Sequence, residues 1–485
     1  MPLQSNELSG KNFSAAKFWL VRLLSIGVVI LAAWIFQTQA VSHLGIYDKR
    51  LLVSAMTFAA LAVSLNLING VTGQFSMGHA AFYMIGAYTG AKLTTVYFDK
   101  HLMPNFAWLL TCVAAGAIVA AFAGWVVGLP SLRLRGDYLA IVTLGFGEIL
   151  RVFVNNQDGS NKAVFGLNLG GSYALDMPRP AKITELAYIF VFLVITIAIC
   201  RNLLKTAHGL GFLSIREDEL AAEATGVNTT KLKVTAFVIG AALAGVAGVL
   251  MAHYNGSVTP NDYTMDVSFL LVTMVVMGGT GSFTGAAIAG ISLKILEESL
   301  RSVPDIPAMS LWAAILTAVL FVALLKRTGL ANALRNERML PIKIIFGELA
   351  LVVIGYYVFR LIKADMSIVF KISGALVFLG AVIAMHTRAN LKSAVAVFGG
   401  MAMSLAAIIL ISKPVAALLH SVPLLEKLVG GTTYKATDVR WAFFAIALVV
   451  TMLVRSQGLF GHHEFSWSFV SKLFGRKHDD VAVAA

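Results

Sequence analysis

Charge is scarce in this sequence of 485 residues, because Asp, Glu, Lys and Arg together make up 13% of it, about half of the ~25% usual in soluble domains. The two cysteines, Cys112 and Cys200, fall in or at the edge of predicted spans and are interpreted as small packing residues that indicate no redox compartment. The sequence has no metal-ligand spacing, no Ser/His/Asp arrangement, no paired-carboxylate site and no G-x-x-x-x-G-K-[ST] phosphate loop. It therefore predicts no catalytic residue, no metal-binding residue and no ATPase site in this chain.

Apolar residues fill most of the remainder, since 58% of the side chains are hydrophobic. A helix needs ~20 apolar residues to cross a bilayer. Stretches near this length occur at 20–37, 51–69, 77–97, 106–129, 138–154, 186–204, 232–254, 266–279, 283–300, 311–325, 344–362, 367–386, 393–412 and 440–454. They predict an all-α polytopic membrane protein with about fourteen transmembrane or partly re-entrant helices. The first stretch is interpreted as a retained span rather than a signal peptide, because membrane segments continue downstream.

The net charge of +13 follows the membrane instead of forming a basic patch interleaved with aromatic residues, so no nucleic-acid partner is predicted. If the N-terminus is cytoplasmic and the spans alternate, the inner segments hold twenty Lys and Arg residues and the outer segments eleven. Positive residues accumulate on the cytoplasmic side of membrane proteins. Both termini and the segment 201–233 are therefore predicted to be cytoplasmic.

Two Gly-rich polar segments interrupt the apolar helices: NGVTGQFSMGHAAF (69–82) and VMGGTGSFTGAAIAG (276–290). Non-helical backbone is tolerated within a membrane only where it lines a cavity or is buried in protein, so both segments are candidates for a substrate route. Close helix packing through small residues is the alternative. The candidate route residues in the two segments are Gln74, Ser76, His79, Gly279 and Gly281. For His79, a purely structural hydrogen bond is the alternative.

Ionisable residues inside spans are costly and are functional candidates for that reason. Glu148 is the best of them and joins the candidate route residues, although an ion pair with Arg151, three residues on, would explain it equally well. Glu297 and Glu298 lie near a helix end beside Arg301 and are expected to face water.

A polar segment, SIREDELAAEATG (214–226), places five charged residues among thirteen. The stretch from Asp218 to Thr225 is rich in helix formers, and Gly226 could end a helix there. A short helix on the surface of a bundle is suited to dock into a groove of another protein. A solvated loop is the alternative interpretation.

Four segments, 64–91, 129–151, 216–248 and 276–290, together resemble the permease subunits of bacterial branched-chain amino acid ABC transporters. The quoted pieces are SLNLINGVTGQFSMGHAAFYMIGAYTGA, LPSLRLRGDYLAIVTLGFGEILR, REDELAAEATGVNTTKLKVTAFVIGAALAGVAG and VMGGTGSFTGAAIAG. The closer similarity is to the second of the two permeases in such systems. RWAFFAIALVVTMLVRSQGLFG (440–461) is similar to the closing span of that family.

The resemblance implies a bacterial inner-membrane protein that works with a sister permease, two cytoplasmic ATP-binding subunits and a periplasmic substrate-binding protein. ATP would be used by those partner subunits, and no cofactor is expected in this chain. The resemblance also implies that residues 209–230 are the coupling segment that inserts into a cleft of the ATPase. Contacts there would come from Arg216, Glu217, Asp218, Glu219, Ala221, Ala222, Glu223 and Gly226.

The chain departs from the family pattern at three places. Leu220 stands where ABC permeases generally have Glu, so that the acid is displaced to Glu219 or Glu223. The outer loop 155–185 lacks the Gly-Gly-Pro-x-Gly stretch of relatives, which leaves the substrate open. Residues 301–438 match nothing in the family, and their periodicity predicts four additional spans at the periphery.

The predicted domain organisation has five parts. It comprises an N-terminal region with the first span (1–50), a permease core (51–300), an insert of about four helices (301–438), a closing span (439–461) and a cytoplasmic tail (462–485).

The predicted function is the permease subunit of an ATP-driven importer of Leu, Ile and Val. The alternatives are a proton-coupled secondary transporter that uses Glu148 or His79 as a proton relay, and an ABC permease for urea or amides. A structural membrane scaffold is a further alternative, but it leaves the two Gly-rich segments without a purpose.

Overall fold

The computed structural model describes residues 45–97, 104–131, 137–156 and 184–301, together with a few short pieces (31, 33, 37–38, 173–174, 306–307 and 433–434). The helices are α2 (Ile46–Asn66), η2 (Leu67–Val71), α3 (His79–Tyr97), α4 (Asn105–Ser131), α5 (Asp137–Asn155), α6 (Leu186–Leu204), α7 (Ala207–Glu217), α8 (Glu219–Ala224), α9 (Thr229–Asn255), η4 (Pro260–Tyr263), α10 (Met265–Gly278) and α11 (Phe283–Arg301). Two antiparallel two-residue pairings join β1 (Tyr173–Ala174) to β2 (Ser257–Val258) and β3 (Ile306–Pro307) to β4 (Thr433–Tyr434).

The eight predicted spans between 51 and 300 each coincide with a helix to within about five residues. Five helices of the described residues are long and apolar enough to cross a membrane: 46–71, 105–129, 138–155, 186–204 and 229–255. The protein is therefore a multi-pass helical membrane protein. Of the remaining six predicted spans, the first (20–37) is described only at residues 31, 33 and 37. The four spans of the insert 301–438 and the closing span lie outside the described residues.

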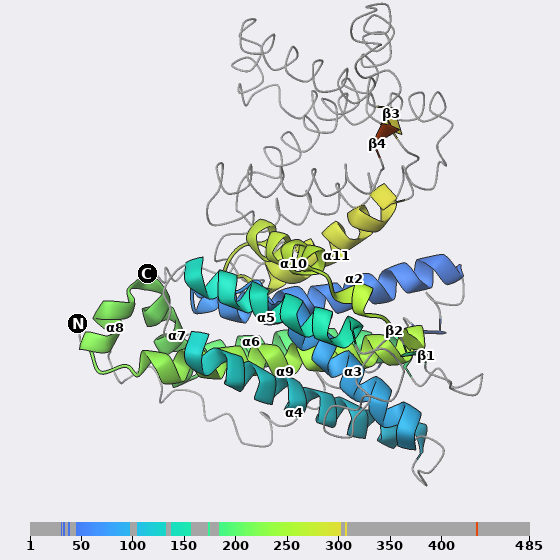
Figure 1. Cartoon of the computed structure of the whole chain (residues 1–485). Coiled ribbons are helices and arrows are strands. Elements are labelled where there is room, and N and C mark those ends of the chain that lie inside the picture. Colours follow the sequence, from blue (N-terminus) through green and yellow to red (C-terminus); the bar gives the residue numbers. More distant parts are fainter. Residues whose placement is uncertain are drawn as a thin grey trace, which may run out of the picture.

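Helix α9 lies at the centre of the bundle. It packs along α3 and α4 and also contacts α2 and α6, while α10 and α11 lie beside α2 on one side of the bundle (Figure 1). In α2, 89% of the most apolar window is buried, against 22% in α5. A helix that is apolar all round belongs in the interior, so α2 is an inner helix and α5 a peripheral one.

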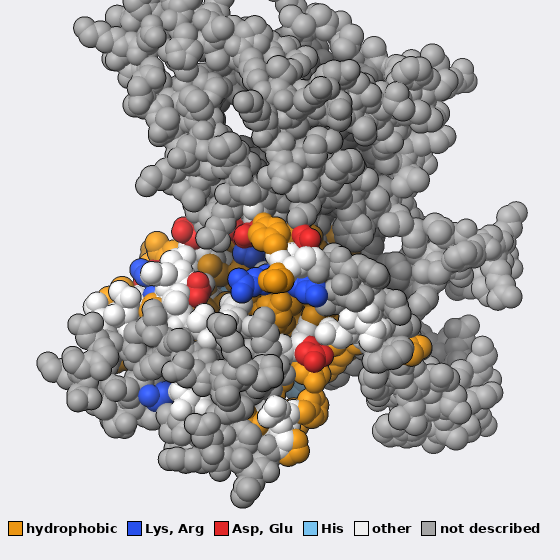
Figure 2. Space-filling view, turned by 90° about the vertical axis from the view of Figure 1, so that its right-hand side faces the viewer, with side chains coloured by type: hydrophobic (Ala, Val, Ile, Leu, Met, Phe, Trp, Pro, Cys, Tyr) orange, Lys and Arg blue, Asp and Glu red, His pale blue; other side chains and the backbone are white. Residues whose placement is uncertain are grey.

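The two ends of the bundle differ in character. Helices α7 and α8 project at one end, and the β1–β2 pairing and η4 lie at the other (Figure 1). Figure 2 looks onto this second end, where basic side chains lie close together with acidic side chains around them and hydrophobic ones between. The long helices α2, α3, α4, α5, α6 and α9 run in alternating directions between these two ends (Figure 1).

Close backbone contact between glycines sets the crossing of α3, α4 and α9. A Cβ on Gly86 of α3 would collide with the backbone of Gly245 in α9, and a Cβ on Gly245 would collide with Gly116 of α4. Small residues at such crossings let helices approach closely in a membrane, where dispersion replaces the hydrophobic effect as the driving force.

Replacing Gly86 with Ala should therefore lower the stability of the bundle by about 1–3 kcal/mol, as expected for an overpacked core. Gly145→Ala is the matched control, because a Cβ on Gly145 of α5 meets nothing within 4 Å and Ala favours a helix by about 1 kcal/mol over Gly. Thermal unfolding of both purified variants in detergent measures the difference. Equal losses in the two variants would contradict this account of the helix crossing.

The expectation that Glu297 faces water is wrong. Glu297 is buried, and its Oε2 lies 2.5 Å from Lys294 Nζ, one turn earlier on α11. The Lys294 ammonium also lies 4.2 Å from the centre of the Phe58 ring on α2. The face of α11 that carries these two charges packs on α2, and their mutual pairing makes that burial tolerable.

Candidate functional site

The first Gly-rich segment forms a break between two helices. Helix α2 ends in the π-helical turn η2, residues 72–78 are not helical, and α3 begins at His79. Gln74, Ser76 and His79 are all buried, with at most 5% of each residue exposed. The break thus lies inside the protein, as expected for non-helical backbone at membrane depth.

These three side chains have unusual hydrogen-bonding needs. Both amide atoms of Gln74, the hydroxyl of Ser76 and Nδ1 of His79 are buried without a protein partner, and they make up four of the seven such atoms among the described residues. His79 Nε2 does have a partner, since it lies 2.8 Å from Ser64 Oγ. Buried polar groups normally have hydrogen bonds, so this concentration marks the break as a place that water or a ligand occupies.

The second Gly-rich segment lies against the end of α2. Gly279 and Gly281 both have positive φ, at 112° and 97°. Asn66 of α2 accepts a hydrogen bond from Gly281 N (2.9 Å) and donates one to Ser282 O (2.8 Å). Candidate route residues about 200 positions apart in sequence are therefore brought to the same end of one helix. Sequence reasoning did not single out Asn66, although an asparagine inside an apolar span was a usable signal.

Glu148 joins α5 to α10. Its Oε2 pairs with Arg151 at 2.8 Å, as the spacing predicts, and its Oε1 accepts a hydrogen bond from Met265 N at 3.1 Å. Met265 is the first residue of α10, so the carboxylate lies at the positive end of that helix. One turn and a half earlier on α5, Thr143 Oγ1 accepts a hydrogen bond from Met77 N at 3.1 Å, which links α5 to the first break.

The Glu148 contacts predict different outcomes for two substitutions. Glu148→Ala removes both the ion pair and the helix cap, and should lower stability by about 1–2 kcal/mol. Glu148→Gln keeps an acceptor for Met265 N and should lose less than half as much. Thermal unfolding in detergent distinguishes the two. Equal losses would show that the cap to α10 contributes nothing.

The polar segment 214–226 contains the end of α7 and the whole of α8, so the helix predicted between Asp218 and Thr225 is confirmed. Asp218 caps α8 by accepting hydrogen bonds from Leu220 N (2.9 Å) and Ala221 N (3.1 Å). Gly226, at φ 88°, ends the helix, with Val227 N bonded to Ala222 O at 3.0 Å. This is the αL glycine stop that the sequence predicts. The additional helix α7 before it was not predicted.

Bonds to α9 hold α8 in place. Glu219 pairs with Lys233 at 2.5 Å, and Glu223 accepts a hydrogen bond from Thr229 at 2.7 Å. Ala222 is buried against its own chain, whereas Leu220 is 61% exposed. The two displaced acids thus make internal contacts, and the position where relatives have Glu presents an apolar side chain outward.

Arg216 and Glu217 lie at the end of α7, before α8 begins. Partial burial lowers the pKa of Arg216 and the neighbouring Glu217 raises it. Arginine stays protonated at neutral pH under such shifts, so Arg216 contributes a fixed positive charge at this end of the bundle.

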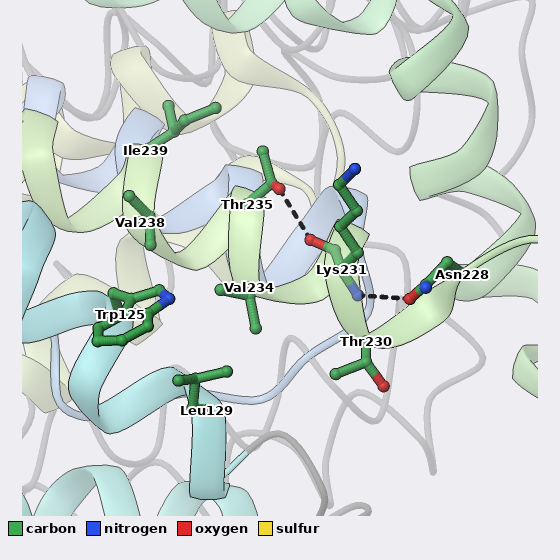
Figure 3. Close-up of a pocket in the computed structure, with 9 residues that line it drawn as sticks. All are labelled: Trp125, Leu129, Asn228, Thr230, Lys231, Val234, Thr235, Val238 and Ile239. Carbon is green, nitrogen blue, oxygen red and sulfur yellow. Dashed lines mark hydrogen bonds between the residues drawn. The ribbon is translucent and has the colours of Figure 1, made fainter.

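A separate groove of about 690 Å³ lies between α4 and α9. Figure 3 shows Trp125 and Leu129 of α4 facing Val234 and Val238 of α9, with polar residues at the start of α9 at one end of the groove. None of the candidate route residues lines it. This groove is therefore distinct from the breaks around α2.

The fold and the two breaks define a multi-pass membrane protein of the transporter kind, with broken helices inside and a short helix pair at one end. The family profile described as "Branched-chain amino acid transport system / permease component" matches residues 49–325. The chain belongs to this family, which confirms the resemblance found in its sequence.

Several curated relatives are similar to the chain. The high-affinity branched-chain amino acid transport system permease protein LivM of Escherichia coli is 35% identical over 309 residues, covering 59% of this chain and 68% of that protein. The corresponding LivH of Escherichia coli is 29% identical over 252 residues, covering 50% and 80%. BraD of Pseudomonas aeruginosa is 28% identical over 258 residues, covering 50% and 81%. No solved structure matches the chain.

Proposed function

We propose that the chain is the transmembrane permease subunit of an ATP-driven importer of branched-chain amino acids. The observation that supports this most strongly is the 35% identity to LivM of Escherichia coli over 309 residues. The same comparison favours this function over a proton-coupled secondary transporter and over a permease for urea or amides.

Partner subunits follow from this function. Both LivM and LivH resemble the chain, and their names describe permeases of one kind of transport system. A sister permease, two ATP-binding subunits that use the ATP and a periplasmic binding protein would complete the importer in a bacterial inner membrane. The charge distribution supports cytoplasmic termini and a cytoplasmic location of α7 and α8.

The substrate would pass along the breaks at the end of α2. Unpartnered polar atoms of Gln74, Ser76 and His79 form hydrogen bonds with the charged ends of the amino acid. When no amino acid is bound, water forms hydrogen bonds with these atoms instead. Gly279 and Gly281 have no side chains, so the substrate can approach the backbone of the second break closely. Glu148 acts mainly by fixing α10 relative to α5.

Helix α8 would enter the ATPase cleft. Its two caps and its bonds to α9 make it a rigid element. Leu220 and Ala221 of α8 are exposed, as are Glu217 at the end of α7 and Gly226 after α8. A rigid element can transmit a displacement caused by the ATPase to the helices on either side of it.

A mild-detergent purification of the tagged chain from its native membrane, with the companions identified by mass spectrometry, tests the proposal. An ATPase and a second permease are expected to co-purify. If the chain is recovered intact but alone, under conditions where a known ABC complex survives, the proposal fails in favour of a secondary transporter.

A further inference from the structure

Two asparagines, Asn66 at the end of α2 and Asn69 in η2, lie about one turn apart, and each bonds one of the two breaks. Asn66 is fully buried and bonds the second break through Gly281 N and Ser282 O. Asn69 bonds the first break through a single residue, since Ser76 N donates to its Oδ1 and its Nδ2 donates to Ser76 O, both at 3.1 Å. We call Asn66 and Asn69 the asparagine clamp.

The clamp is tightly enclosed. A Cβ on Gly70 would collide with the Asn66 amide and with Gly281 N, so the second break lies directly on the backbone of η2. The clamp residues straddle the junction of α2 and the π-helical turn. Such turns are rare and occur frequently at functional sites.

The element before α8 lies against the same region. Helix α7 packs on η2, and Gly73, with φ at 70°, lies against Arg216: a Cβ there would be 3.4 Å from Arg216 Cα. Gly73 is three residues from Ser76, which Asn69 holds. A continuous set of contacts thus runs from α7 through the first break and the clamp to the second break.

We propose that the asparagine clamp is the positioning element that makes both breaks move together when α7 and α8 are displaced. The inference rests on the proposed function and adds to it the route inside the chain. Asn66 makes three directional hydrogen bonds to the backbone of the second break, and Asn69 makes two to Ser76. Because Asn66 is fully buried, water cannot replace its bonds. A displacement of η2 therefore cannot leave either break behind without breaking these bonds. Flexible contacts alone would let the two breaks open independently.

A coupling role and a purely structural role of the clamp predict different results. If the clamp only holds the fold together, its loss lowers ATP hydrolysis and uptake in parallel. If it makes the breaks move together, its loss leaves hydrolysis running while uptake fails, because the ATPase still drives α7 and α8. The ratio of ATP hydrolysed to amino acid transported distinguishes these cases.

The test uses the whole complex in proteoliposomes, with labelled leucine as substrate. Asn69→Ala and Asn66→Ala are expected to keep ATP hydrolysis within about threefold of the unaltered complex and to reduce uptake at least tenfold, which corresponds to about 1.4 kcal/mol or more of lost coupling. Asn202→Ala, at an exposed asparagine of α6, is the matched control and should change neither rate.

Normal uptake in the Asn69→Ala variant, or a parallel fall of both rates, would overturn the clamp proposal alone. Asn69 is only partly buried, so this variant decides the matter even if Asn66→Ala does not assemble. An unaltered complex without ATP-driven uptake would overturn the proposed function, and the clamp proposal with it.

Discussion

Replacing Leu220 with Ala is expected to weaken binding of the ATPase subunit at least tenfold, if α8 enters the ATPase cleft as proposed. A Leu side chain contributes about 1.5–3 kcal/mol when it is fully buried, and 1.4 kcal/mol corresponds to a tenfold change in affinity. Leu220 is 61% exposed in the chain alone, so the ATPase cleft is the place where it becomes buried. The affinity of the purified complex for its ATPase, measured by titration in detergent, checks this.

Folding serves as the internal control for Leu220→Ala. The thermal unfolding temperature of the isolated chain should not change, because the exposed Leu220 side chain packs little against the rest of the chain. Leu110→Ala is the matched substitution, since Leu110 of α4 is 60% exposed and lies outside the segment 209–230. It should leave ATPase affinity within about twofold, well below the roughly tenfold change that 1.4 kcal/mol produces. Equal losses at both leucines would show that α8 is not the docking element.

The second large effect is expected at Gln74, where a substitution should reduce transport without reducing stability. Both amide atoms of Gln74 are buried without partners, and an unsatisfied buried group costs about 1–3 kcal/mol. Gln74→Met keeps a similar length and removes both polar atoms, so it should raise the unfolding temperature or leave it unchanged. Uptake should fall about five- to thirtyfold, because the substrate loses hydrogen bonds worth about 1–2 kcal/mol.

Thr196→Val on α6 is the control for Gln74→Met. The Thr196 hydroxyl is buried but already satisfied by Phe192 O at 2.9 Å, so its removal should leave uptake unchanged. Full uptake by the Gln74→Met variant would remove Gln74 from the substrate route and leave its unpaired atoms to bound water.

The eight helices that coincide with apolar stretches could be predicted from the sequence, because each such stretch ends at a Gly-rich, Pro-containing or charged segment. Helix α7 has no such stretch and was not predicted. Helix α8 was also predictable, since Asp218 is a local start signal and Gly226 a local stop signal, and the effect of neither depends on the rest of the fold. Domain boundaries and the insert 301–438 remain predictions, because they lie largely outside the described residues.

Contacts between distant segments could not be predicted in this way. Asn66 meets Gly281 across 215 positions, and no local pattern encodes that pairing. Glu297 was assigned to water because charged residues near a helix end usually are exposed, but its neighbour Lys294 and the α2 surface decided otherwise. For Glu148, the ion pair followed from spacing, whereas its bond to Met265 N depends on how α10 folds back onto α5.

The most direct test of the central claim is uptake of labelled leucine into proteoliposomes that contain this chain with its co-purifying subunits. The account predicts uptake that requires ATP on the side of α8, stops when the ATPase subunit is omitted, and continues when a protonophore collapses the proton gradient. Uptake that continues without ATP and stops with the protonophore would contradict it.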